Sequence, residues 1–222
     1  MSTQIEPAAS AAAGRMDAIY RRQRHIYDLT RKYYLLGRDR LIADLAPPPG
    51  GSILEVGCGT GRNLVLAGRR YSDAALFGID ISAEMLMTAR KMVSQANLVT
   101  RMALARADAS NFDPQRLFGQ PRFDRILLSY TLSMIPPWRE TLAHLPAMLA
   151  PGGSLHIVDF GQQEHLPRRF KALLFAWLDR FDVSPRADLP RELRQVAEEA
   201  GLQFAFQPLY RGYAWSGTLR AD

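Results

Sequence analysis

One glycine-rich stretch constrains this chain more than any other part of it: residues 52–63, SILEVGCGTGRN. The letters ILEV form a short, mostly apolar run, which is typical of a strand buried on both faces. Gly57, Gly59 and Gly61 follow at alternate positions, and a helical pattern begins directly after them. Glycine allows a ligand to approach the main chain, and the start of a helix offers free N–H groups. The stretch therefore predicts a strand, a loop and a helix that together bind a nucleotide-like ligand.

The spacing of the glycines separates two classes of nucleotide-binding protein. A dinucleotide fingerprint requires G-x-G-x-x-G, but the position of its last glycine is occupied by Arg62. The sequence E-V-G-C-G-T-G, which begins at Glu55, instead resembles motif I of the Rossmann-like S-adenosylmethionine methyltransferases. The resemblance implies that S-adenosylmethionine is the cofactor. It also implies that the loop packs against its methionine part and ribose, with Glu55, Gly57, Gly59 and Gly61 among the cofactor-binding residues.

The next strand and helix supply three further cofactor candidates. Asp80 ends a second buried strand, 74–80, about 20 residues after the loop, where an acid can accept hydrogen bonds from both ribose hydroxyls. Ile81 follows it and is placed to pack on the adenine. Ser82 is expected to cap the next helix. Met85, in that helix, can then close the other side of the base.

Two later strands complete the predicted cofactor site. A third strand ends over 104–109, where Asp108 resembles the acid that accepts from the adenine amino group in this family, with Ala109 beside it. A helix-capping aspartate is the alternative interpretation of Asp108. A fourth strand over 123–130 carries Ser129 to the crevice in which substrates meet the cofactor in doubly wound sheets.

The order of these patterns predicts an α/β fold. The resemblance makes it a Rossmann-like methyltransferase fold: a seven-stranded, mostly parallel sheet with one antiparallel strand, plus an N-terminal helical lid. Further expected elements are a helix from the prolines at 136 and 137 through 149, a turn at 151–153, a fifth strand at 154–160, a helix at 190–200 and a closing antiparallel pair at 202–209 and 210–219.

The N-terminal segment holds most of the excess positive charge. Between positions 15 and 40 there are eight Lys/Arg and three acids, so the segment contributes 8 − 3 = +5 of the chain's net +6. Aromatic and apolar residues recur there at three- and four-residue steps, which indicates one face of a helix. Such a helix fits a lid over the pocket, an interfacial membrane helix, or a helix packed on the domain. We expect a disordered tail over 1–14, a lid or membrane-contact segment over 15–46, and a methyltransferase domain over 50–222.

A closer resemblance lies in the same segment. Residues 20–39, YRRQRHIYDLTRKYYLLGRD, are similar to the N-terminus of bacterial diacylglyceryl-homoserine N-methyltransferases. These enzymes complete the betaine lipid diacylglyceryl-trimethylhomoserine by three successive methylations. The resemblance implies an amine-bearing lipid substrate, contact with an anionic membrane surface, and a peripheral position at the inner, cytoplasmic face of the bacterial membrane. Phosphatidylethanolamine, a quinone precursor or another small molecule are the alternative acceptors.

The expected product suggests residues for the acceptor side. A quaternary ammonium group is favoured over aromatic faces. The aromatic residues near the inferred pocket are Tyr27, Tyr33, Tyr34, Tyr130 and Trp138. We take Tyr27, Tyr34 and Tyr130 as the catalytic candidates, because a tyrosine hydroxyl can orient the lone pair of an amine. Arg38 is suited to a carboxylate, either of homoserine or of the cofactor's methionine part.

A second amphipathic patch occupies residues 165–180, where apolar and aromatic residues stand beside arginines and a lysine. We expect a helix inserted after the fifth strand, the place where acceptor-recognising elements tend to lie in this fold. A plain packing helix and a lipid-facing groove are both compatible with the pattern.

Composition excludes several other functions. The single cysteine, Cys58, rules out an internal disulfide and fits a reducing compartment, and the four histidines lack metal-ligand spacing, so we expect no metal. No run of about 18 apolar residues is present.

A pI near 9.8 is compatible with a nucleic-acid partner as well as with a membrane surface. The sequence IPPW at 135–138 differs from the motif of amino-group DNA methyltransferases, because Ile135 occupies its polar position and five residues separate Tyr130 from Pro136. We therefore expect no nucleic-acid partner.

Overall fold

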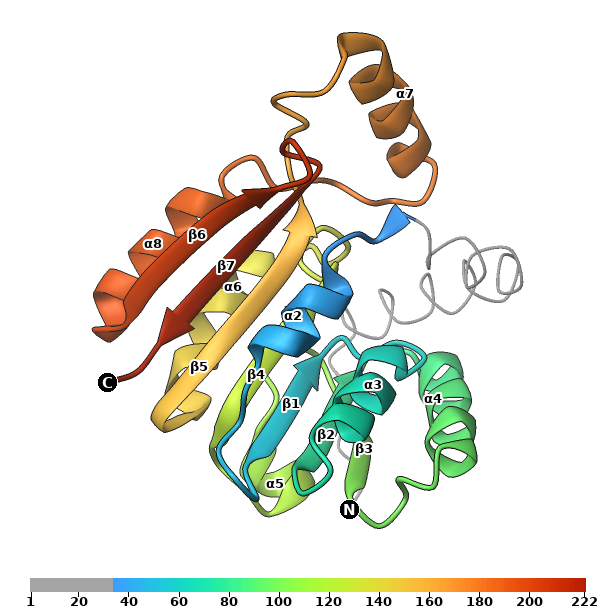
Figure 1. Cartoon of the computed structure of the whole chain (residues 1–222), viewed down its shortest axis with the longest axis vertical. Coiled ribbons are helices and arrows are strands. Elements are labelled where there is room, and N and C mark those ends of the chain that lie inside the picture. Colours follow the sequence, from blue (N-terminus) through green and yellow to red (C-terminus); the bar gives the residue numbers. More distant parts are fainter. Residues whose placement is uncertain (1–33) are drawn as a thin grey trace.

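The computed structural model describes residues 34–222, and a seven-stranded sheet organises this part of the chain (Figure 1). The strands are β1 (Ser52–Val56), β2 (Ala75–Asp80), β3 (Met102–Arg106), β4 (Phe123–Ser129), β5 (Leu149–Phe160), β6 (Gln203–Leu209) and β7 (Ala214–Arg220). Their order across the sheet is β3-β2-β1-β4-β5-β7-β6. All neighbouring pairs from β3 to β5 are parallel, whereas β7 is antiparallel to both β5 and β6. The predicted fold class is therefore confirmed.

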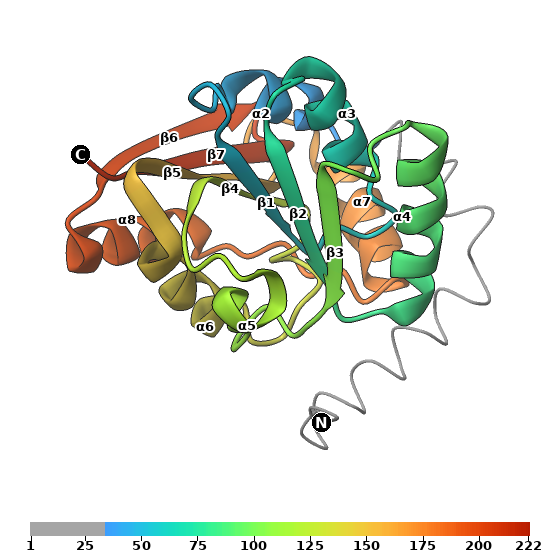
Figure 2. The same cartoon turned by 90° about the horizontal axis from the view of Figure 1, so that it is seen from below.

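Helices cover both faces of the sheet, as Figure 2 shows. They are α2 (Arg38–Asp44), α3 (Arg62–Arg70), α4 (Ala83–Gln95), α5 (Pro114–Phe118), α6 (Trp138–His144), a 3₁₀ turn η1 (Leu145–Met148), α7 (Arg168–Asp179) and α8 (Leu189–Ala200). Helices α2, α3 and α4 lie on one face, and α5, α6 and α8 lie on the other. Strand β1 contributes to both cores by alternation, since Ile53 packs on the α2–α3 side and Leu54 on the α6–α8 side.

Several element boundaries differ from prediction, and one helix was not expected. Strand β5 begins at Leu149, because the turn at 151–153 is looped out within it: Phe123 pairs with Leu149 but Arg125 pairs with Ser154. The helix expected to run through Leu149 stops at His144 and continues as a 3₁₀ turn that contains Pro146, which lacks an N–H donor and disfavours a preceding helical residue. Helix α5 was not predicted, being only five residues long.

The N-terminal segment is described only from Tyr34 onwards, so the expected tail, most of the expected lid, Tyr27 and Tyr33 lie outside the described residues. Helix α2 begins after Gly37, whose φ of 87° is in the left-handed region. It buries Leu41 and Ile42 and packs on α3 and β5. This part of the segment belongs to the helical layer of the domain.

Helix α7 stands apart from these layers. It projects beyond the carboxyl ends of the strands, between β5 and α8 in sequence (Figure 1). Within residues 34–222, no helix combines the length and the apolar composition needed to cross a bilayer.

Candidate active site

A large cavity lies where the strand order reverses. Strands β2 and β3 lie on one side of β1, and β4 and β5 lie on the other. Open α/β sheets bind ligands in the crevice outside the carboxyl ends of the strands at this point. The cavity has a volume of about 1080 Å³, beyond the usual 300–1,000 Å³ or so of a small-molecule pocket. It is therefore large enough for two ligands side by side.

Ten of the predicted site residues line this cavity. They are Arg38, Glu55, Gly57, Gly59, Asp80, Ile81, Asp108, Ala109, Ser129 and Tyr130. They come from the ends of β1, β2 and β4, from the segment after β3, and from the start of α2. Segments as far apart in sequence as Arg38 and Tyr130 are thus brought to one cavity.

The glycine loop forms the floor of the cavity and depends on its missing side chains. Gly57 has φ 73°, and a Cβ added there would lie 2.5 Å from Cγ2 of Thr131. The N–H groups of Gly57 and Cys58 both donate to the carbonyl oxygen of Ile79, at 2.9 Å each, which ties the loop to β2. The main chain therefore comes close to the cavity in a conformation that a larger residue would disturb.

Asp80 links the loop to the start of α4. Its Oδ2 accepts from the N–H of Gly59 at 2.8 Å, and its Oδ1 accepts from the N–H of Ser82 at 2.9 Å. Ser82 caps α4 as predicted, since its Oγ accepts from the N–H of Met85 at 3.3 Å. Asp80 also lines the cavity, where its carboxylate is of the type that accepts from ribose hydroxyls.

Glu55 is a buried acid at the inner end of the cavity. Its Oε1 accepts from Nδ2 of Asn63 at 2.7 Å, while its Oε2 is buried with no hydrogen-bond partner among the described residues. Burial raises the pKa of Glu55 to about 8; the bond from Asn63 and the charge of Arg38 oppose this shift. The uncharged carboxyl group is therefore the main form at neutral pH, and a cation bound beside it would favour ionisation.

Asp108 lies just beyond the end of β3 and closes a local turn. Its Oδ1 accepts from both the N–H and the Oγ of Ser110, at 2.9 and 2.7 Å. It is not an N-cap in this structure, because the nearest helix, α5, is capped by Asp113. The turn fixes the carboxylate at the cavity wall, in a position suited to accept from an amino group.

Tyr130 and Arg38 also line the cavity. Tyr130 directly follows β4 with φ 56°, a strained conformation for a non-glycine residue, and its hydroxyl donates to the carbonyl oxygen of Leu36 at 2.6 Å. Burial raises the pKa of Tyr130 well above its usual value, so the phenol is neutral. Arg38 is also buried, and its Nε donates to the carbonyl oxygen of Leu35 at 3.1 Å.

Four predicted residues lie outside the cavity wall. Gly61 starts α3, and a Cβ there would lie 3.1 Å from Cβ of Ala89 on α4, so it serves helix packing. Met85 is buried against Met134 and Phe181. Tyr34 packs edge-on against Trp177, with ring centroids 4.6 Å apart. Trp138 is buried beneath the guanidinium groups of Arg139 and Arg186.

The connection between α7 and α8 was missed by sequence analysis. It places Asp182, Ser184 and Arg186 on the cavity wall. Arg186 donates from Nε to the carbonyl oxygen of Leu132 at 3.0 Å and from Nη2 to that of Ile135 at 2.8 Å. Burial lowers the pKa of Arg186. The only available signal was polar residues in a loop near a predicted acceptor element, which is too common to identify a site.

The cavity wall fits the cofactor that motif I implies. Glycine backbone, the Asp80 and Asp108 carboxylates and the unpartnered Oε2 of Glu55 together supply acceptors and close approach for a ribose, an adenine amino group and an amino-acid ammonium. No group of three or more potential metal ligands occurs among residues 34–222.

Comparison with known proteins agrees with this geometry. A family described as a methyltransferase domain matches residues 20–205. A phosphatidylethanolamine N-methyltransferase from Cereibacter sphaeroides is 34% identical over 110 residues, which is 50% of this chain and about half (51%) of that relative. A 2-phytyl-1,4-naphtoquinone methyltransferase from Trichormus variabilis is 27% identical over 177 residues, covering 77% of this chain and 74% of the relative.

Solved structures show the same fold. A SAM-dependent methyltransferase from Aquifex aeolicus superposes with a TM-score of 0.62 at 17% identity, covering 87% of this chain and 93% of the other. Because the family match spans most of the chain, the chain belongs to the methyltransferase-domain family.

Proposed function

We propose that this methyltransferase converts diacylglyceryl-homoserine to diacylglyceryl-trimethylhomoserine by three successive N-methylations. We place the reaction at the inner face of the bacterial cytoplasmic membrane, with the protein bound peripherally. The tyrosine-rich segment 20–39 supports this acceptor by its resemblance to enzymes of that reaction. A relative that is named for N-methylation of an aminolipid supports the class of acceptor.

The observation that carries the proposal is the continuity of one cavity from the glycine loop to the α7–α8 connection. Its wall includes Glu55, Gly57 and Asp80, which fit the cofactor. The same wall includes Tyr130 and Arg186, an aromatic and a cation, which fit an amine that carries a carboxylate. Homoserine offers both groups, so both sets of residues have a counterpart in the proposed reactants.

The residues of the chain act by binding and orientation. Bound S-adenosylmethionine supplies the methyl group as a sulfonium, so no strong nucleophile is required of the protein. Asp80 and Asp108 fix the nucleoside part through carboxylate hydrogen bonds. Arg38 or Arg186 holds the carboxylate of the acceptor.

Tyr130 orients the acceptor nitrogen. Its hydroxyl proton is committed to Leu36, so its oxygen can only accept, and in the first two transfers an N–H of the amine that donates to it turns the nitrogen lone pair to a defined side. The tertiary amine of the third transfer has no N–H, and contact with the aromatic ring positions it instead. Burial keeps the phenol neutral. Each transfer requires an uncharged amine, and the released proton passes to water.

The test is to supply the purified protein with radiolabelled S-adenosylmethionine and a lipid extract, and to identify the labelled lipids. We expect mono-, di- and trimethylated homoserine lipids, and pure diacylglyceryl-homoserine should be converted in the same way. Label confined to phosphatidylethanolamine would contradict the homoserine proposal and would favour the second candidate, phosphatidylethanolamine N-methylation, for which the relative from Cereibacter sphaeroides is the supporting observation.

A further inference from the structure

Helix α7 exposes one face that has both apolar and basic side chains. Four residues, Arg169, Leu173, Ala176 and Arg180, recur at steps of four, three and four along α7 and its C-cap, so they share one face of the helix. All four are exposed, and Leu173 is 73% exposed. We call these four residues the outer stripe of α7.

The opposite face attaches α7 to the domain. Leu178 is fully buried, and Leu174, Phe175 and Trp177 pack against the core cluster on the α2–α3 side of the sheet. The helix is therefore held in a fixed orientation, and the outer stripe is directed away from the core. Leu173 is the most exposed of the large apolar side chains in the described part of the chain.

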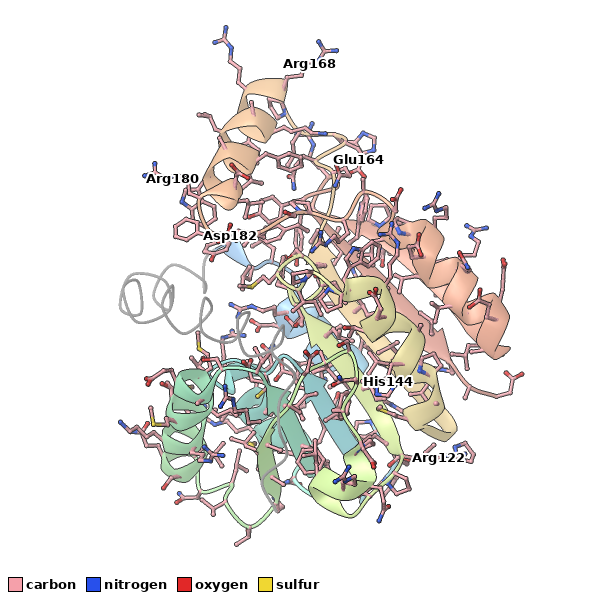
Figure 3. The ribbon with its side chains drawn as sticks, turned by 180° about the vertical axis from the view of Figure 1, so that it is seen from behind. Arg122, His144, Glu164, Arg168, Arg180 and Asp182 are labelled. Atoms are coloured by element: carbon pink, nitrogen blue, oxygen red, sulfur yellow. The ribbon has the colours of Figure 1, made fainter. Side chains whose placement is uncertain are left out.

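The charge around the outer stripe is strongly positive. Residues 168–180 contain Arg168, Arg169, Lys171 and Arg180 against Asp179, a net charge of 4 − 1 = +3. Figure 3 shows Arg168 and Arg180 pointing away from the molecule at the end opposite Arg122. An exposed leucine flanked by arginines is the pattern of an interfacial helix, in which the apolar residue inserts and the guanidinium groups stay at the headgroups.

The outer stripe is also next to the cavity in the chain. The residues that directly follow α7 supply Asp182, Ser184 and Arg186 to the cavity wall. Figure 3 shows Asp182 below the end of α7 that carries Arg180. A lipid in a surface that touches α7 therefore has a short route for its headgroup into the cavity.

We propose that the outer stripe of α7 docks the enzyme on an anionic phospholipid surface. The proposal deepens, and rests on, the proposed action on a lipid-borne amine. Charge complementarity selects this occupant: two copies of α7 facing each other would bring together two segments of +3. A nucleic acid would gain nothing from Leu173 at the centre of the stripe, whereas a bilayer interface gains from both kinds of side chain.

The experiment is co-sedimentation of the full chain with phosphatidylcholine vesicles, with and without phosphatidylglycerol. Arg169→Glu combined with Arg180→Glu should weaken binding to the anionic vesicles by about tenfold or more at low salt, at roughly 1 kcal/mol per basic residue near the surface. Leu173→Ser should weaken binding by about threefold, and its effect should persist at high salt, where charge effects are screened.

The matched control is Arg116→Glu combined with Arg122→Glu, which changes the net charge equally. Arg116 belongs to α5, which lies at the end of the molecule far from α7 (Figure 1), and Arg122 lies at the same end (Figure 3). This control should leave binding within about twofold of the wild type. Equal losses in both double variants, or unchanged binding in both α7 variants, would overturn the proposal. So would a dimer that Leu173→Ser converts to a monomer, since the stripe would then be a contact between copies.

Methylation assays separate this proposal from the proposed function. With a short-chain, monomerically dissolved homoserine acceptor, the α7 variants should retain wild-type activity and lose it only on vesicles. If the wild type methylates no homoserine lipid but the α7 variants still lose vesicle binding, the proposed function fails and the docking surface stands. If the wild type methylates the acceptor but α7 variants bind vesicles normally, only the docking proposal fails.

Discussion

At the scale of single residues, one carboxylate joins the glycine loop to the start of α4. Asp80 accepts from the N–H groups of Gly59 and Ser82, so it fixes the glycine loop relative to the start of α4 while facing the cavity. A half-buried carboxylate with two such bonds is held in one orientation, as the predicted contact with ribose hydroxyls requires. Its loss should therefore affect ligand binding more than folding.

We predict that Asp80→Ala weakens binding of the demethylated cofactor, S-adenosylhomocysteine, by about 1.5–3 kcal/mol, roughly 10- to 150-fold, as measured by calorimetry. Asp113→Ala is the matched control, because Asp113 also accepts two backbone N–H bonds but at the cap of α5, outside the cavity wall. The Asp113→Ala variant should bind S-adenosylhomocysteine with the affinity of the wild type. Unchanged affinity in the Asp80 variant would refute the ribose role.

Glu55 makes the free energy of unfolding depend on pH with a sign opposite to that produced by most acids, whose pKa is lowered in the folded state. Its pKa is raised by burial from 4.5 to about 8, so between these values the folded state holds a proton that the unfolded state releases. The free energy of unfolding therefore falls as pH rises through this window. His156 acts in the other direction below pH 6.5, because burial lowers its pKa to about 4. Between pH 6.5 and 8, His156 therefore does not oppose the effect of Glu55 on the free energy of unfolding.

We predict that the free energy of unfolding of the ligand-free protein falls from pH 6.5 to 8 and that Glu55→Gln reduces this fall by about 2 kcal/mol. Glutamine keeps the size of the side chain and can accept from Asn63 but cannot ionise. Urea unfolding at several pH values measures both proteins. A slope that is identical in the two would show that Glu55 does not titrate in this range.

At the scale of elements, the junction of β1 and α3 depends on a contact with the segment after β4. Gly57 has a left-handed φ and faces Thr131, whose Oγ1 donates to the carbonyl oxygen of Val56 at 3.1 Å. The loop and the acceptor-side segment thus pack with no room for a methyl group. A substitution at Gly57 should therefore change the packing of Thr131, and a substitution at Thr131 should change the packing of Gly57.

We predict that Gly57→Ala lowers the free energy of unfolding by about 2 kcal/mol or more, through the φ penalty and the overlap with Thr131. Gly119→Ala should lower the free energy of unfolding by only about 1 kcal/mol, the cost of a left-handed φ for alanine. The φ of Gly119 is 71°, and nothing lies within 4 Å of the added Cβ. Adding Thr131→Ala to Gly57→Ala should recover part of the loss, with a coupling energy of about 1 kcal/mol by denaturant unfolding. Strictly additive effects would mean that the contact is not the cause.

The elements that sequence predicts well are those whose pattern is local. The strand before Gly57 and the acid at the end of β2 are read directly from hydrophobicity and spacing, and the structure brings both to the cavity. Arg186 and Asp182 reach the same cavity from a loop without a motif, so only the tertiary fold places them. Met85 was predicted to face the adenine but packs against Phe181, because the orientation of the helix about its own axis, which the sequence does not give, decides which way the side chain points.

At the scale of the whole molecule, the positive charge is divided between two regions, the N-terminal segment and the segment of α7. Residues 1–33 contain six Lys/Arg and three acids, a net charge of 6 − 3 = +3, which equals that of residues 168–180. The two segments together account for the full net charge of +6, so the rest of the chain is neutral overall. This division predicts that membrane attraction is concentrated in these segments and is not a property of the general surface.

We predict that deletion of residues 1–33 abolishes methylation of lipid acceptors and lowers co-sedimentation with anionic vesicles, because half of the net charge and most of the tyrosine-rich segment are removed. Strands β1–β7 and helices α2–α8 all begin after this cut, so circular dichroism should still show a folded domain. Deletion of residues 1–14 alone, which contain no Lys or Arg, is the matched control and should change neither property. Full lipid activity after removal of residues 1–33 would exclude a lid or membrane-contact role for that segment and would leave the outer stripe of α7 as the remaining candidate for attachment.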